Sequence, residues 1–384
     1  MTSLLRERVP GQQAQVDNAE LFFDLVFVFA VTQVSHALLH HLSVIGAIQA
    51  AIMLLAMWWV WIYTAWATNW LDPARIPIRI LLFVLMLLGL VFSTSIPAAF
   101  GEHGLLFAGA YVTMQVGRCL FTAWAMRDEP ENHRNFLRIS AWEAFGGIFW
   151  IIGAFLGAEM RMAVWALALI IEYASPAVSF WTPWSGRSTI GDLNVEGGHM
   201  AERASLFIII ALGESIMATG GTFAESARDT SSIIAFLATF IGSVAMWWIY
   251  FNSASERGHH RIAHSQHAGR LASTVYTYMH TLIVAGIIVS AVADDLVLEH
   301  PTGELAAGPA LAVIVGGPAL FLVGTALFQA SVQQRMPWAQ IVAVLALGVL
   351  AMFGSGLEPL PLALSTLVPL LALAAWDSYE RLRR

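Results

Sequence analysis

The chain alternates long apolar segments with short polar ones, and this pattern predicts a bundle of membrane-spanning helices. About 20 apolar residues are enough for a helix to cross a bilayer. The longest interior polar stretches, 182–199 and 254–269, are too short to form a soluble domain. The sequence therefore predicts twelve spans, six on either side of residues 182–199. They lie near residues 20–42, 44–69, 77–99, 104–127, 137–157, 161–181, 200–222, 231–253, 270–293, 305–329, 337–356 and 359–376.

Composition supports an integral membrane protein. Hydrophobic residues make up 58% of the chain, charged residues only 12%, and the mean hydropathy is +0.69, whereas soluble domains have about 25% charged residues. The single cysteine, Cys119, excludes a disulfide within the chain. The polar N-terminal stretch lacks the apolar core and cleavage site of a signal peptide, so we expect the first helix to stay in the mature protein.

The arginines predict how the helices are oriented. All 19 basic residues are arginines. If the N-terminus is cytoplasmic, sixteen of them fall in cytoplasmic segments, Arg161 and Arg228 fall outside, and Arg118 lies within a span. Cytoplasmic loops of membrane proteins are enriched in arginine and lysine. We therefore expect both termini to be cytoplasmic.

The two halves of the chain resemble a direct repeat. Glu20 is followed by AMWWV at 56–60, and Glu202 is followed by AMWWI at 245–249. We therefore predict an all-α fold of two parallel six-helix repeats, 1–181 and 200–384, joined by a cytoplasmic loop at 182–199. Chance recurrence of the tryptophan motif is the alternative.

The stretch from Glu20 to His41 is long enough to span the membrane but carries polar groups on both sides. At 100° per residue, Glu20 and Asp24 fall on one side of a helix, and Gln33, His36 and His40 fall on the other. Charge facing hydrocarbon costs about 2.5 kcal/mol or more. We therefore expect an interior helix packed by protein on both sides. Alternatively, the two acids lie in the headgroup layer, where the helix dipole favours anions.

Several ionisable residues of the first half fall at a similar depth in the cytoplasmic half of the bilayer. Arg118 is expected to form an ion pair with at least one of Asp24, Glu143 and Glu172. Such a network would be either a structural clamp between helices or a polar cavity that binds an ion or substrate.

In the second half, His199, Glu202 and Arg203 precede a mid-membrane carboxyl, Glu214. Its small neighbours, such as Gly213, would allow another helix or a ligand to come close. We expect Glu214 to carry a proton, and the alternative is a permanent interhelical hydrogen bond.

The ninth span places Tyr276 and His280 one turn apart on the same face. This pair is either a proton relay or a histidine bonded to a nearby acid. His260, His264 and His267 have a spacing that suits a metal on a helix, but no acid or cysteine joins them, so a solvated basic loop is favoured and no metal is expected. His36 and His40 are interpreted in the same way.

Three stretches carry a resemblance to a known family. They are ELFFDLVFVFAVTQVSH at 20–36, HMAERASLFIIIALGESI at 199–216 and YTYMHTLIVAGII at 276–288. The chain resembles the bacterial low temperature requirement protein A (LtrA) family over nearly its whole length. The resemblance implies a multi-pass protein of the bacterial inner membrane without fixing an activity.

Details of the family pattern agree with this resemblance except at two positions. Arg118 and the pair Glu172 and Pro176 fit the family. Glu172 stands where the family usually has aspartate. Leu282 stands where a proline is common after the histidine, which removes the reason to expect a kink there.

Function is predicted at the level of class. The chain lacks a glycine-rich phosphate loop, HExxH, GxSxG and a selectivity-filter sequence. A secondary transporter or permease, coupled to protons and needing no cofactor, is the leading hypothesis. A membrane-embedded enzyme acting on a lipid or isoprenoid-like substrate and an ion channel are the alternatives. Expected partners are the lipid bilayer and a small-molecule, ion or lipid ligand, with no nucleic acid. The candidate substrate- or proton-binding residues are Glu20, Asp24, His36, Arg118, Glu143, Glu172, Glu202, Arg203, Glu214, Tyr276 and His280.

Overall fold

The structure is a computed structural model, and it describes an all-helical protein. The residues it describes are 3–7, 15–188, 196–226, 228–255, 273–303, 305–306, 308–333 and 336–383. Over these ranges the chain forms twelve α-helices and no β-strand. The predicted helical fold is confirmed. The histidines at 259–267 lie outside the described residues.

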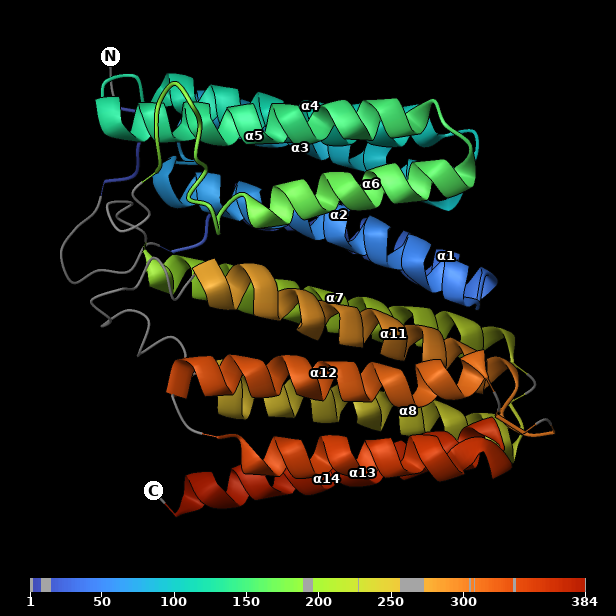
Figure 1. Ribbon diagram of the computed structural model, residues 1–384. Coiled ribbons are helices and arrows are strands. Elements are labelled where there is room, and N and C mark those ends of the chain that lie inside the picture. Colours follow the sequence, from blue (N-terminus) through green and yellow to red (C-terminus); the bar gives the residue numbers. More distant parts are fainter. Residues whose placement is uncertain are drawn as a thin grey trace. The chain divides into compact units, whose positions relative to one another are not determined.

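The chain divides into two compact units, each of which is a helical bundle (Figure 1). The first unit contains the described residues of 1–37 and 47–203, and the second contains those of 38–46, 204–266 and 271–384. Helices of the first half are α1 (Asn18–His40), α2 (Val44–Trp70), α3 (Ile76–Ser95), α4 (Gly104–Ala125), α5 (Pro130–Ala154) and α6 (Ala158–Ala174). Helices of the second half are α7 (Gly197–Glu225), α8 (Thr230–Ile249), α11 (His280–Glu299), α12 (Pro309–Gln333), α13 (Trp338–Phe353) and α14 (Pro359–Leu382).

Each predicted apolar segment overlaps one of these helices, although the predicted span 161–181 extends beyond α6 and the predicted span 270–293 starts before α11. Among the described residues, eleven helices are long and apolar enough to cross a membrane. The twelfth, α6, has 17 residues and lies at the lower limit for a span. Prolines at the starts of α3 and α5 explain two of the boundaries, because proline suits the first helical turn, where its missing N–H costs no hydrogen bond.

Aromatic rings form the core of the first unit. Phe92 of α3 stacks on Phe107 of α4 with ring centroids 4.5 Å apart. Trp150 of α5 lies 4.7 Å from Tyr111 of α4 and 5.1 Å from Trp165 of α6. These rings bury large apolar areas, and they hold α3–α6 side by side along their lengths (Figure 1).

Within the first unit, α1 buries only one of its two sides, which differs from the predicted packing by protein on both sides. Glu20 and Asp24 lie on its buried side, with no exposed surface. Phe22 and Leu25 lie on the other side and are 54% and 55% exposed. His36 is exposed near the end of the helix. The helix therefore has a charged inner face and an outer face that is apolar at Phe22 and Leu25 and carries exposed His36 and His40 near its end.

Arg161 joins the ends of several helices. Its buried guanidinium donates hydrogen bonds to the carbonyls of Ala99 and Gly101, both at 2.7 Å, after α3. It also donates to the carbonyls of Ala154 and Leu156 at the end of α5, at 3.0 and 3.1 Å. These carbonyls lack intrahelical donors, and the arginine supplies them.

We predict that Arg161→Ala will lower the stability of the protein by about 3 kcal/mol or more. Several buried carbonyls would lose a charged donor, and each such bond contributes about 1.5–3 kcal/mol. Thermal unfolding in detergent measures the effect. Arg161→Lys should recover only part of the stability because an ammonium cannot reproduce the planar fork. Equal melting temperatures for the alanine variant and the wild type would contradict this role.

In the second unit, α11 and α12 pack closely because small residues face each other. A side chain at Gly317 would lie 2.6 Å from the Ser290 hydroxyl, and one at Gly324 would lie 2.8 Å from Ile283. Small residues let the backbones of membrane helices approach closely.

Candidate functional site

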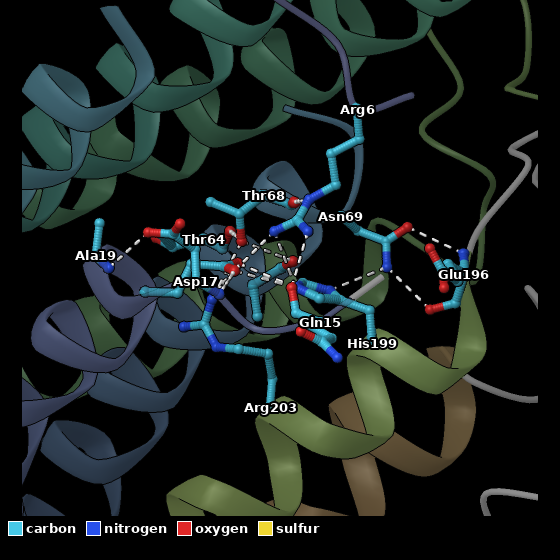
Figure 2. Close-up of polar contacts among 12 residues, drawn as sticks. Arg6, Gln15, Asp17, Ala19, Thr64, Thr68, Asn69, Glu196, His199 and Arg203 are labelled. Carbon is cyan, nitrogen blue, oxygen red and sulfur yellow. Dashed lines mark hydrogen bonds and ion pairs between the residues drawn. The ribbon is translucent and has the colours of Figure 1, made fainter. Parts of the chain in front are cut away.

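A cluster of buried charges links α1 and α2 to the start of α7 (Figure 2). Arg203 donates to Glu20 Oε1 at 2.9 Å and to Asp24 Oδ1 at 2.5 Å, and all three side chains are fully buried. The same guanidinium donates to the Thr68 hydroxyl of α2 at 3.1 Å. We call Arg6, Glu20, Asp24, His199 and Arg203 the Arg203 cluster.

Helical spacing explains how the cluster forms. Glu20 and Asp24 are four residues apart on α1, and His199 and Arg203 are four residues apart on α7. Residues at this spacing lie on the same face of a helix. The two carboxylates of α1 therefore face the Arg203 guanidinium and the His199 ring of α7 across the interface between these helices.

Glu20 has its hydrogen-bonding capacity filled. Arg6 Nη2 donates to Oε2 at 2.7 Å, and the Asp17 backbone N–H donates to the same atom at 2.9 Å. The His199 ring and Arg203 bond to Oε1 at 3.1 and 2.9 Å. Four donors match the lone-pair sites of an ionised carboxylate. Glu20 is therefore a fixed anion of the cluster.

Asn69 sets the orientation of the His199 ring. Its amide lies 3.3 Å from His199 Nδ1, so Nδ1 accepts and the N–H of Nε2 donates to Glu20. Asn69 also donates to the Glu196 carbonyl at 2.9 Å and accepts from the Glu196 N–H at 3.0 Å (Figure 2). The end of α2 thus fixes both the start of α7 and the histidine tautomer.

The N-terminal segment, described at residues 3–7, packs against the end of α2 beside this cluster. The Arg6 N–H donates to the Trp70 carbonyl at 2.8 Å, and its Nε donates to the Thr68 carbonyl at 2.9 Å. Two further backbone contacts join this segment to the residues that follow α2. Leu5 pairs with Leu71, and the Asp72 N–H donates to the Leu4 carbonyl. Arg6 is thereby held against Glu20 by main-chain bonds.

Asp24 differs from Glu20 because one of its oxygens has no partner. Its Oδ1 accepts from Arg203 and from the Trp61 indole at 2.8 Å. In the part of the chain that the structure describes, Asp24 Oδ2 and Arg203 Nε make no hydrogen bond. Since two guanidinium groups face two carboxylates and one neutral imidazole, the cluster is balanced in charge but offers one open acceptor and one open donor.

Arg118 does not form the direct ion pair that was expected of it. Its guanidinium donates to the Val60 carbonyl and to the Thr64 hydroxyl, both at 3.2 Å, and it lies 5.5 Å from the Tyr63 ring centroid. Within the described ranges no carboxylate makes an ion pair with it. Asp24 is bonded by Arg203 of α7 instead. Arg118 was predicted at the same depth as Asp24, Glu143 and Glu172, but its guanidinium does not point toward their carboxylates.

The other two acids of the first unit form a second buried group. Glu172 accepts from the Tyr111 hydroxyl at 2.5 Å and from the Trp150 indole at 2.9 Å. Glu143 accepts from the Trp59 indole at 3.3 Å, and its other oxygen has no partner among the described residues. Aromatic donors rather than arginine therefore hold these carboxyls.

His280 belongs to a polar group inside the second unit. Its Nδ1 lies 3.0 Å from the Val275 carbonyl, which can only accept, so this nitrogen carries the proton. The Tyr250 hydroxyl lies 2.9 Å from Nε2 and therefore donates to it. Tyr250 also bonds to Ser205 of α7. Tyr276 packs 5.1 Å from the His280 ring, on the same side as predicted.

The remaining candidates lie at more open positions. Glu202 and Glu214 are half-buried along α7, and His36 is exposed on α1. Within its own unit, no atom lies within 4 Å of the place where a side chain would project at Gly213. The described residues contain no group of three or more metal-ligating side chains.

The comparisons with known proteins place this architecture in a family. A family model described as Bacterial low temperature requirement A protein (LtrA) matches residues 15–375. The chain belongs to the LtrA family. An uncharacterized protein of Rhizobium meliloti (strain 1021) is 38% identical over 377 residues, which cover 97% of this chain and 91% of the relative. No solved structure matches. The LtrA chain is thus a multi-pass membrane protein.

Sequence reasoning did not select Arg6, Trp61 and Asn69, which complete the cluster of this LtrA protein. Arg6 was counted only among the arginines that predict the orientation of the helices. Trp61 is one of several tryptophans at 58–61, and nothing in the sequence distinguishes it from the others. Asn69 gave no signal of its own, because an amide at the end of a predicted span can be solvated and its burial follows only from the packing of the helices.

Proposed function

We propose that this LtrA protein is a secondary transporter that couples solute movement to protons. The observation that carries this proposal is the Arg203 cluster. It buries carboxylates and guanidinium groups inside membrane-spanning helices, where ionisable residues are costly and mark ion or substrate pathways. The open oxygen of Asp24 and the open N–H of Arg203 give a proton or a solute a place to bind.

The cluster supports a coupling mechanism. A proton that binds Asp24 neutralises one partner of Arg203 while Glu20 stays bonded to four donors. Arg203 then has an unmatched charge, and an anionic group of a solute can bind it. Because Arg203 is the residue at which the chain passes from the first unit to the second, such a change would alter the start of α7.

Other features agree with transport but carry less of the proposal. Six α-helices of the described chain fall in each half, as parallel repeats at 1–181 and 200–384 with the connecting loop at 182–199 would require. The arginine distribution favours cytoplasmic termini and the bacterial inner membrane. A reporter enzyme that is active only outside the cytoplasm should therefore be inactive when it is fused after residue 384.

Glu214 and His280 are the proposed proton groups of the second unit. Glu214 is half-buried in α7. His280 is hydrogen-bonded to the Tyr250 hydroxyl, which is in turn hydrogen-bonded to Ser205. Glu214→Gln keeps the shape and cannot titrate. Transport that keeps its pH dependence in this variant would assign the proton role elsewhere.

Reconstituted vesicles test the proposal directly. Purified protein is placed in liposomes that enclose a pH-sensitive dye, and a panel of small solutes is added under an imposed membrane potential. We expect at least one solute to move protons only when the protein is present. Asp24→Asn should abolish this signal because it keeps the shape of the side chain but cannot bind a proton. Asp128→Asn, at an exposed loop of the same unit, should leave the signal unchanged.

Two outcomes would replace the transporter with another class. Conversion of a lipid in the same vesicles, detected by mass spectrometry and lost in Asp24→Asn, would identify an enzyme. Ion currents that need no solute and show unitary steps would identify a channel.

A further inference from the structure

The second unit contains a small cavity between α8, α11, α12 and α14. Its volume is about 40 Å³, which is room for about three water molecules. The polar side chains on its wall are Thr239, Ser290, Asp294 and Thr366. The cavity is too small for an organic solute, but it has room for a dehydrated ion with a water molecule.

Ser290 is a buried hydroxyl without a hydrogen-bond partner on this wall. The residue is 4% exposed, and its Oγ makes no hydrogen bond to any part of the chain that is described. Buried polar groups in folded proteins almost always have a partner. A bound ligand in the cavity would supply the missing one.

Proline removes one helical hydrogen bond beside the cavity. Pro318 lies inside α12 and has no N–H, so the Ile314 carbonyl has no helical donor four residues later. Both residues line the cavity. The hydroxyls of Thr239 and Thr366 donate to carbonyls of their own helices at 2.9 and 2.7 Å, which leaves their oxygen lone pairs available.

Asp294 gives the cavity its charge. It lies one helical turn after Ser290 on α11, and the wall contains no arginine, lysine or histidine. The next residue, Asp295, accepts instead from the Thr222 hydroxyl at 2.8 Å. One carboxylate together with uncharged oxygen ligands suits a cation that carries a single positive charge.

We propose that this cavity binds a sodium ion. Hard cations prefer oxygen ligands such as carboxylates and hydroxyls, and the lining residues Asp294, Ser290, Thr239 and Thr366 carry both. A divalent ion would be less well balanced by one carboxylate. Sodium binding here is independent of whether the Arg203 cluster transports a solute, and it would provide the second unit with an ion site of its own.

Binding of radioactive sodium to the purified full-length protein tests the proposal. Thermal unfolding in sodium chloride and in choline chloride of equal concentration gives a second readout, because a ligand that binds the folded state raises the melting temperature. We expect the wild type to bind sodium and to be stabilised by it. Asp294→Asn should lose both effects, and Ser290→Ala should weaken binding by about tenfold, the equivalent of one lost polar contact.

Glu299→Gln is the matched control, since it removes the same charge from an exposed position of the same helix. It should bind sodium like the wild type. Melting in choline chloride shows whether Asp294→Asn and Ser290→Ala are folded. Absence of sodium binding by the wild type, equal binding of potassium, or undiminished binding by Asp294→Asn would overturn the proposal. Sodium binding without any transport would contradict the transporter and leave the site intact.

Discussion

Replacing Arg203 with alanine is expected to destabilise the protein by about 3–5 kcal/mol, the usual cost of removing one partner from a buried ion pair. Glu20 would keep its bonds to Arg6 and His199, but Asp24 would keep only the Trp61 indole. An ionised carboxylate would then be buried with one neutral donor. Thermal unfolding and the yield of monodisperse protein in detergent measure the loss.

Arg118→Ala is the control for this experiment. Arg118 is an equally buried guanidinium of the same unit, but its partners are the neutral oxygens of Val60 and Thr64. Its loss should cost about 1–3 kcal/mol, the penalty of unsatisfied neutral groups. Adding Asp24→Asn should partly rescue Arg203→Ala and should not rescue Arg118→Ala. If Arg203→Ala and Arg118→Ala lower the stability equally, and Asp24→Asn rescues neither, the ion pair between Arg203 and Asp24 does not contribute more to stability than neutral hydrogen bonds do.

The helices could be predicted because their signal is local. A bilayer requires a run of about 20 apolar residues in each span, and the chain contains such runs with polar breaks between them. The exception was α1, where polar residues on both sides suggested burial on both sides. Within the first unit its outer face is exposed and apolar at Phe22 and Leu25, and His36 and His40 are exposed on the same face near the end of the helix.

The Arg203 cluster could not be derived from the sequence because its contacts are remote along the chain. Glu20 and Arg203 are separated by 183 positions. The depth of a residue in the membrane follows from its position within a span. On this basis Arg118 was predicted at the same depth as Asp24, Glu143 and Glu172. The direction in which a side chain points depends on how helices pack, which spacing alone does not determine. Arg203 and Glu20 were both candidates, but their pairing was not predicted.

Replacing Glu172 with leucine is expected to destabilise the protein by about 3 kcal/mol, because two buried donors would lose their acceptor, at about 1–3 kcal/mol each. The Tyr111 hydroxyl and the Trp150 indole both donate to this carboxyl. Leucine has a similar volume and accepts no hydrogen bond. The carboxyl also packs against Gly146, where an added side chain would lie 2.8 Å from Glu172 Oε1, so no other group can enter to replace it.

A second substitution distinguishes lost hydrogen bonds from poor packing. Tyr111→Phe in the wild type leaves Glu172 without one donor and should be destabilising. The same change in the Glu172→Leu background removes a donor that already lacks its acceptor, so its cost should fall to that of the hydrogen bond which the Gln115 amide donates to the Tyr111 hydroxyl at 3.3 Å. Glu172→Gln keeps an acceptor for the Trp150 indole and should cost much less than leucine. Additive losses for Tyr111→Phe and Glu172→Leu would mean that the two residues are not coupled, and that this carboxyl fills space between α4, α5 and α6 without organising them.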